Sequence, residues 1–269
     1  MLTTVFVVSG FLEILLPLLL GLYLWRKFGA RWKVFFVGLA AFIISQIIHV
    51  PLLYGFNWIF SQTAIEHTWS ESALVLLNAV VLGLMSGLCE EPLRWLSFKY
   101  LKEEGSSFRA NLMLGAGHGG IESILVGVNV IGTAITLILW KNGSVPIPIE
   151  QIPLMDSLVA TDWYLPLLGV FERICAIILH LSLSSLVWLS VRNKKASFLI
   201  LAIAWHALVN GVVVYLSGIG WSPIALEGVM AIATVFSVVV LRHIYQKYGK
   251  DSLYALEKLP SEAPLQDAS

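Results

Sequence analysis

The sequence predicts an all-α polytopic membrane protein with about seven transmembrane helices, its N-terminus outside and its C-terminus in the cytoplasm. Of the 269 residues, 58% are hydrophobic and 13% are charged, whereas a soluble domain of this size has about 25% charged residues. The apolar residues are grouped into long runs, and a ~30 Å hydrocarbon core requires about 20 apolar residues per helix. These observations exclude a large soluble domain and predict a multi-pass protein of the cell membrane.

Seven apolar runs, each bounded by polar residues, predict the membrane spans. The first run follows no basic segment and contains no small-residue cleavage site, so we expect it to be a span and not a cleaved signal peptide. The later runs are separated by connections rich in charged residues, turn residues or both. The predicted spans cover residues 3–25, 34–55, 73–98, 109–140, 164–190, 196–217 and 224–246.

The positions of the basic residues predict the orientation. Basic residues gather in the first, third and fifth connections and at or after the end of the last span, whereas the other connections hold acids and the single cation Lys141. Cytoplasmic loops carry an excess of Lys and Arg, so the N-terminus is expected outside. No run of five basic residues occurs, which predicts a lipid bilayer and no nucleic acid as partner. The cytoplasmic basic residues are Arg26, Lys27, Arg31, Lys33, Lys99, Lys102, Arg109, Arg192, Lys194, Lys195, Arg242, Lys247, Lys250 and Lys258.

Polar side chains inside four of the spans are the first indication of function. A charged side chain in mid-membrane costs at least ~2.5–3.5 kcal/mol, so each one requires a partner, a wet cavity or a function. The rise of ~1.5 Å per residue places most of these side chains at a similar depth, reachable from the cytoplasmic side. They are Glu90, Glu91 and Arg94 in the third span, His118 and Glu122 in the fourth, Glu172, Arg173 and His180 in the fifth, and His206 and Asn210 in the sixth.

Helical spacing predicts which of these residues share a face. Residues four apart are neighbours on a helix, so His118 lies beside Glu122 and His206 beside Asn210. Glu172 and Arg173 lie about two turns farther out and are given a supporting role, as are Arg94 and His180. A lone histidine in a span, such as His49 or His180, is more often a packing residue than a ligand.

Such a group of residues can hydrolyse an amide bond. Hydrolysis requires a base that holds water and donors for the oxyanion, and a glutamate with one histidine, together with a second histidine and an asparagine, supply both. We favour water activation without a metal, although His118, Glu122 and His206 offer a possible zinc set. The predicted catalytic residues are Glu90, Glu91, His118, Glu122, His206 and Asn210.

Three motifs in order resemble those of the YhfC family of intramembrane proteases. They are the Glu90-Glu91-x-x-Arg94 motif, the segment from Gly117 to Glu122, and the His206-x-x-x-Asn210 pair, with Glu172-Arg173 between the last two. The resemblance extends to the type II CAAX prenyl proteases, the bacteriocin-immunity proteins and the PrsW proteases. It implies that Glu90 acts with His118 on water, that His206 and Asn210 hold the oxyanion, and that the substrate is a membrane-embedded or prenylated protein or peptide.

Several alternatives remain open at this stage. The CAAX-type motif has three residues between its second Glu and its Arg, but here there are two. Arg94 therefore pairs either with Glu91, leaving Glu90 to act, or with Glu90, in which case the roles exchange. Other functions are a non-catalytic scaffold or immunity protein that binds another membrane protein, and a proton-coupled transporter. We divide the chain into a transmembrane domain, 1–248, with a catalytic-like core at 73–217, and a polar cytoplasmic tail, 249–269.

Overall fold

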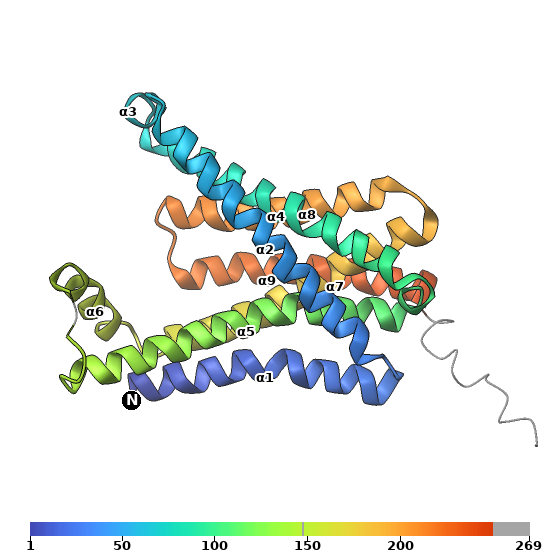
Figure 1. Cartoon of the computed structure of the whole chain (residues 1–269), viewed down its shortest axis with the longest axis horizontal. Helices are drawn as coiled ribbons and strands as arrows, with labels where there is room; N and C mark the ends of the chain where they lie inside the picture. Colours follow the sequence, from blue (N-terminus) through green and yellow to red (C-terminus); the bar gives the residue numbers. More distant parts are fainter. Residues whose placement is uncertain (147, 250–269) are drawn as a thin grey trace, which may run out of the picture.

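The computed structural model describes residues 1–146 and 148–249, and within these ranges the chain forms helices and no strand. Each predicted span is one helix, which confirms the predicted fold class of a seven-helix membrane protein (Figure 1). The helices are longer than the predicted runs at most ends, because a helix continues into the polar interface after its apolar run has ended. They are α1 (Leu2–Phe28), α2 (Trp32–Ser61), α4 (Glu71–Leu101), α5 (Phe108–Lys141), α7 (Leu165–Asn193), α8 (Ala196–Gly218) and α9 (Pro223–Ile244).

Short helical segments in the connections were not predicted. They are α3 (Ile65–Thr68), α6 (Ile152–Val159), the 3-10 turns η1 (Lys102–Gly105) and η2 (Ile149–Gln151), and the π turn η3 (Tyr245–Gly249). Segments of three to eight residues are too short to carry a clear hydrophobic period. In α6, Met155 is buried against Phe6, Ala134 and Leu137. Of the predicted tail, residues 250–269 lie outside the described residues.

Local sequence signals explain several helix ends. Ser70, Ser107 and Ser222 each precede a helix, and each hydroxyl accepts a hydrogen bond from the backbone N–H three residues later. This bond satisfies one of the free N–H groups at a helix start. At the other end of α1, Gly29 adopts a left-handed conformation with φ of 61°, which a residue without a Cβ adopts at little cost.

The central helix of the bundle is α7. It contacts α1, α4, α5, α8 and α9, and from Cys175 to Ser190 only Ile178 and Leu181 are not fully buried. Buried polar bonds hold it in place: the Asn111 side chain of α5 donates to Ser185 Oγ of α7 at 2.7 Å. The polar side chains of α7 from Arg173 to Ser190 are buried and therefore directed at the surrounding helices and not at lipid.

Close contact between α4 and α8 sets the position of the motifs on these two helices. A Cβ atom on Gly83 would lie 2.5 Å from the carbonyl oxygen of Ala207, and one on Gly87 would lie 2.6 Å from that of Ile203. Small residues spaced four apart allow the backbones of membrane helices to approach this closely. Glu90 and Glu91 follow about one turn after Gly87 on α4, so the close contact places both glutamates next to His206 of α8.

Candidate active site

A buried carboxylate on α4 lies between two imidazoles, one from α5 and one from α8. Oε2 of Glu90 lies 2.9 Å from Nε2 of His118 and 4.0 Å from Nε2 of His206. All three residues are at most 5% exposed. We call these three residues the Glu90 cluster.

The orientation of the His206 ring is fixed by the neighbouring glutamate. Nδ1 of His206 lies 2.8 Å from Oε1 of Glu91, and because a carboxylate only accepts, Nδ1 carries the proton and donates. In neutral His206 the lone pair is then on Nε2, which faces Glu90. Two acceptors 4.0 Å apart require a donor between them, such as a bridging water, or a second proton on His206.

The adjacent glutamates have different partners, which decides between the two pairings of the motif. Arg94 forms its ion pair with Glu91, with Nε 3.1 Å from Oε2. Arg94 is fully buried, and its two terminal nitrogens donate to the backbone oxygen of His180 at 2.8 Å and to Nδ1 of His180 at 2.9 Å. Glu90 is therefore left without a hydrogen bond from Arg94.

A second chain of charged groups continues from Arg94 along α7. His180 Nε2 lies 2.8 Å from Oε2 of Glu122, whose Oε1 accepts a bond from Arg173 at 2.9 Å. Arg173 also contacts Glu172. We call this chain the arginine network; it consists of Glu91, Arg94, His180, Glu122, Arg173 and Glu172.

The expected neighbours His118 and Glu122 take different partners across the helices. They share the same helix, but His118 contacts Glu90 of α4 whereas Glu122 contacts Arg173 and His180 of α7. A Cβ atom on Gly119 would lie 2.8 Å from Cδ2 of His180, so the missing side chain there makes room for the imidazole. His180 thus joins α4 to α5.

A cavity of about 350 Å³ opens onto this site. Glu90, His206 and Asn210 are on its wall, whereas Glu91 and His118 are fully buried behind the wall. The Asn210 side chain donates to Oγ of Ser86 at 2.9 Å. The lining residues are Phe42, Gln46, His49, Leu82, Ser86, Glu90, Glu122, Glu172, Arg173, Ala176, Leu179, His180, His206, Asn210, Val213, Val214 and Met230.

Helix α2 contributes two polar residues to this cavity that sequence reasoning did not assign to the site. Gln46 and His49 line it, and neither ring nitrogen of His49 has a hydrogen-bond partner among the described residues. The available signal was their spacing, because polar residues three apart inside an apolar run share one face of the helix. The four helices expected to present polar side chains to the site are thus joined by α2 as a fifth.

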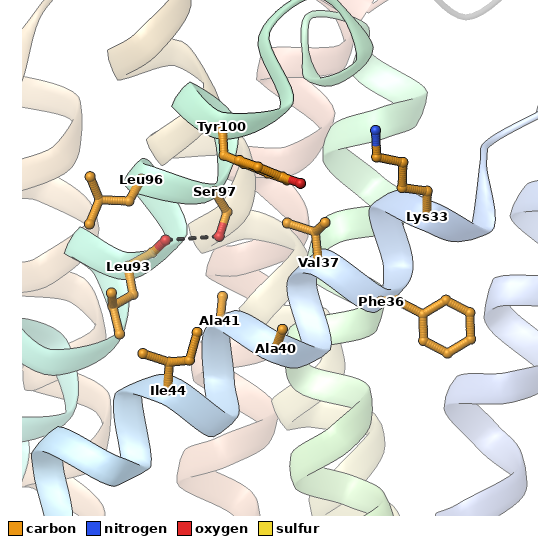
Figure 2. A pocket seen from close by; sticks show the side chains of 10 residues that line it. All are labelled: Lys33, Phe36, Val37, Ala40, Ala41, Ile44, Leu93, Leu96, Ser97 and Tyr100. Carbon is orange, nitrogen blue, oxygen red and sulfur yellow. Dashed lines mark hydrogen bonds between the residues drawn. The ribbon is translucent and has the colours of Figure 1, made fainter.

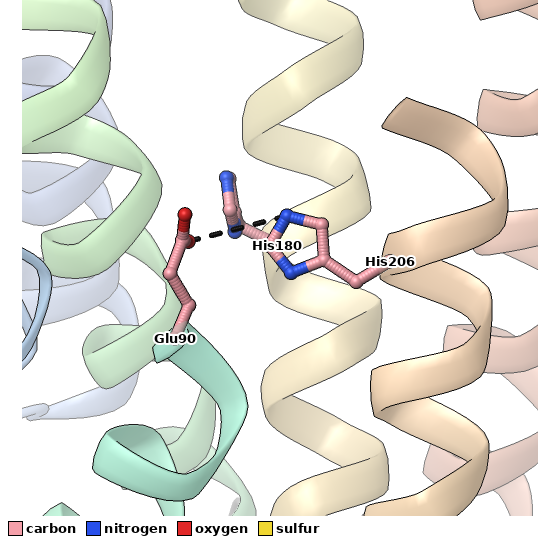
Figure 3. Close-up of side chains that lie close together, drawn as sticks. All are labelled: Glu90, His180 and His206. Atoms are coloured by element: carbon pink, nitrogen blue, oxygen red, sulfur yellow. Dashed lines mark ion pairs between the residues drawn. The ribbon is translucent and has the colours of Figure 1, made fainter. Parts of the chain in front are cut away.

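Three residues are close enough together to bind one metal ion. Glu90, His180 and His206 offer ligand atoms within 4.8 Å of one another, and they project from α4, α7 and α8 (Figure 3). Two imidazoles and a carboxylate are the donor types of many catalytic zinc sites, so the donor types allow zinc. Of the zinc set expected from the sequence, only His206 belongs to this group, and His118 and Glu122 do not.

A groove of about 610 Å³ lies beside the site between α2 and α4 (Figure 2). On α4, the residues Ser86, Glu90, Leu93 and Ser97 are three or four apart, so one helix face continues from the cavity into the groove. The groove is mainly apolar, with polar groups toward one end. Its lining residues are Lys33, Phe36, Val37, Ala40, Ala41, Ile44, Leu93, Leu96, Ser97 and Tyr100.

Fold and site together define a multi-pass helical membrane protein with a buried carboxylate–imidazole cluster. Residues 12–241 match the family described as YhfC intramembrane metalloprotease, and the chain belongs to the YhfC family. It is 33% identical over 246 residues to the Bacillus subtilis (strain 168) protein called "Uncharacterized membrane protein YhfC", covering 86% of this chain and 91% of that protein. No solved structure matches the chain significantly.

Proposed function

We propose that this protein is an intramembrane peptidase in which Glu90 and His118 activate the attacking water. The observation that carries the proposal is the difference between two adjacent carboxylates. Glu91 is held by Arg94, whereas Glu90 lies on the cavity wall, contacts His118 and faces His206 across 4.0 Å. A base must reach the proton that it removes, and of these two glutamates Glu90 is the one on the cavity wall. The family description as a protease supports the same reaction class.

The proposed reaction uses a water held between Glu90 and His206. Glu90 takes a proton as the water oxygen attacks the peptide carbonyl, and His118 holds the Glu90 carboxylate in place. The proton then passes to the leaving amine as the carbon–nitrogen bond breaks. The products are one carboxylic acid and one amine, so the base is regenerated.

Two donors are available for the oxyanion. Asn210 brings an amide N–H to the cavity wall once it turns from Ser86. His206 brings Nε2–H when it carries a second proton, and the Glu91 carboxylate at Nδ1 stabilises that charged form. Fixed donors aimed at a developing oxyanion supply a large part of the rate enhancement in acyl transfer.

The family description as a metalloprotease also implies a bound metal ion, without saying which one. A zinc ion at Glu90 and His206 would polarise the carbonyl and activate water at neutral pH. In the reaction proposed above, Glu90 transfers the proton and His206 and Asn210 hold the oxyanion, and no step depends on the metal. Metal content and chelator sensitivity of the purified protein distinguish the two forms.

The groove between α2 and α4 supports a substrate that reaches the site from the bilayer. Its walls are mainly apolar, and one face of α4 continues from it to Glu90. An extended apolar segment or a lipid-modified peptide fits such a surface, in line with the resemblance to CAAX-type and PrsW proteases. Comparing prenylated and unmodified versions of one peptide tests whether a prenyl group contributes.

The basic residues support an orientation with the N-terminus outside and the C-terminus in the cytoplasm. Ser106 and Ser144 are exposed at opposite ends of α5. Each is replaced by cysteine in turn, and an impermeant maleimide is added to intact cells; the native Cys89 and Cys175 are buried and give little background. We expect labelling at position 144 and protection at position 106. The reverse pattern would invert the proposed topology.

The decisive experiment for the activity uses protein purified into nanodiscs and a library of quenched fluorogenic membrane peptides. Wild type is compared with Glu90→Gln and with Glu150→Gln, an exposed loop acid that serves as the matched control. We expect cleavage by wild type and control and none by Glu90→Gln. Binding of a membrane protein without cleavage by any form would instead favour a scaffold, and proton-driven uptake into proteoliposomes would favour a transporter.

A further inference from the structure

The two ring nitrogens of His180 face groups of opposite hydrogen-bonding character. Nδ1 lies 2.9 Å from Nη2 of Arg94, and Nε2 lies 2.8 Å from Oε2 of Glu122. A guanidinium only donates and a carboxylate only accepts. Nδ1 must therefore be the acceptor and Nε2 must carry the proton. Both contacts select the same tautomer, and the other tautomer would oppose both.

The other two histidines of the site are not held in this way. His206 has the opposite tautomer, because Nδ1 donates to Glu91, and the Nε2 lone pair faces Glu90. In His118, Nε2 contacts Glu90 whereas Nδ1 has no hydrogen-bond partner in the described part of the chain. By the same reasoning, Nε2 of His118 donates to the Glu90 carboxylate, and the lone pair of its ring is on the unpartnered Nδ1.

We propose that His180 is a positioning residue, held as the Nε2–H tautomer by Arg94 and Glu122, and that it is not a metal ligand. A neutral imidazole binds a metal through its single lone pair. In His180 that lone pair is on Nδ1, where Arg94 occupies it. Proximity to Glu90 and His206 therefore does not make His180 the third member of a zinc site.

The role left to His180 is to fix Arg94. Arg94 binds both the His180 ring and its backbone oxygen, and it holds Glu91, which in turn orients His206. His180 thus acts on His206 of the Glu90 cluster through two side chains in series, Arg94 and Glu91.

This inference rests on the proposed function only for the location of the site. The experiment reads tautomers by NMR in protein labelled with ¹⁵N-histidine in nanodiscs, and long-range ¹H–¹⁵N correlations distinguish protonated from unprotonated ring nitrogens. His180→Gln and His206→Gln assign the signals. No substrate is needed, so failure of the inference is distinguishable from failure of the peptidase proposal.

We expect His180 to be protonated at Nε2 and unprotonated at Nδ1, and to keep this form when Zn²⁺ is added. A His180 ring protonated at Nδ1, neutral or charged, would overturn the proposal. A shift of the His180 nitrogens to metal-bound positions on addition of Zn²⁺ would also overturn it. Changes at His206 without a change at His180 would support it, as would a wild-type protein that takes up no zinc.

A matched pair of variants tests the positioning role separately. Glutamine at position 180 keeps an acceptor and an N–H donor on one side chain, whereas leucine has neither. We expect His180→Gln to keep the wild-type zinc content and the Nδ1-protonated form of His206, and His180→Leu to lose that form of His206. Loss of zinc from a folded His180→Gln protein that wild type retains would refute the assignment.

Discussion

The Glu90 cluster and the arginine network share helices α4 and α5, yet only the network places a guanidinium beside its carboxylates. In the network, Glu91 pairs with Arg94, and Glu122 pairs with Arg173. In the cluster, Glu90 contacts imidazole and no guanidinium. A cation fixed beside a buried carboxylate keeps that carboxylate in a structural contact, whereas a carboxylate without a fixed cation remains available to a water molecule. This difference is the basis of the proposal that Glu90 reacts and that the network positions it.

The largest effects should come from the Glu90 cluster. Glu90→Gln and His118→Ala should each lower kcat by about 10³-fold or more, within the range for a general base. Because the two residues share one task, the double variant should be about as inactive as either single variant. Turnover in nanodiscs measures this, with thermal unfolding to show that each variant is folded. Losses that multiply in the double variant would contradict the shared role.

Removing Arg94 should affect stability most. Arg94→Leu leaves Glu91 buried without its cation, and breaking a buried pair costs about 3–5 kcal/mol. Activity should fall with it, because Glu91 orients His206, whereas Arg94→Lys should be partly tolerated. Unfolding in detergent measures the loss.

The Glu91→Leu/Arg94→Leu double variant serves as the control for this prediction. It removes both charges, so it should be less destabilised than the sum of the single changes. Simple additivity would show that the two side chains do not stabilise each other.

Asn210 should be needed for rate more than for substrate binding. Asn210→Ala should lower kcat by about 10²–10³-fold with little change in KM, the loss expected for one oxyanion donor. The matched control is Ser86→Ala, which removes the resting partner of the Asn210 amide. If Asn210 acts on the oxyanion, Ser86→Ala keeps most of the activity. Equal losses in both variants would indicate that their mutual bond is purely structural.

The smallest effect on the kinetics is expected from substituting His49 of α2. His49 lines the cavity with both ring nitrogens unpartnered among the described residues, and it belongs to neither the cluster nor the network. His49→Phe should raise KM several-fold, equivalent to about 1 kcal/mol for one lost hydrogen bond, and leave kcat nearly unchanged. Gln46→Leu provides a second test on the same wall. A large fall in kcat for His49→Phe would extend the reactive group to α2.

The sequence was sufficient to predict the spans and most residues of the site, because both follow from local rules. Apolar runs predict helices, and charged groups inside them are costly enough to mark a site. The structure brings Glu90, His118 and His206 together at one level, and it keeps Glu172 and Arg173 within the network.

The partners of each side chain were not predictable in the same way. Helical spacing says which residues share a face, but it does not say which helix lies opposite. His118 and Glu122 were expected to be neighbours, yet their contacts are to α4 and α7. The central position of His180 depends on α7 lying between α4 and α5, which no single helix reveals. The roles of these residues in catalysis remain predictions.

The contact between α4 and α8 makes the geometry of the site sensitive to residues that have no chemistry of their own. Gly83 and Gly87 allow the two backbones to approach closely, because neither has a side chain. A methyl group at position 83 or 87 would lie 2.5 or 2.6 Å from a carbonyl oxygen of α8. Any added atom must push α8 outward and carry His206 away from Glu90. The 4.0 Å separation between Glu90 and His206, which a water must bridge, thus depends on the absence of a side chain at Gly83 and at Gly87. An alanine scan that skips glycines would therefore miss two positions, Gly83 and Gly87, at which even a methyl group changes the geometry of the site.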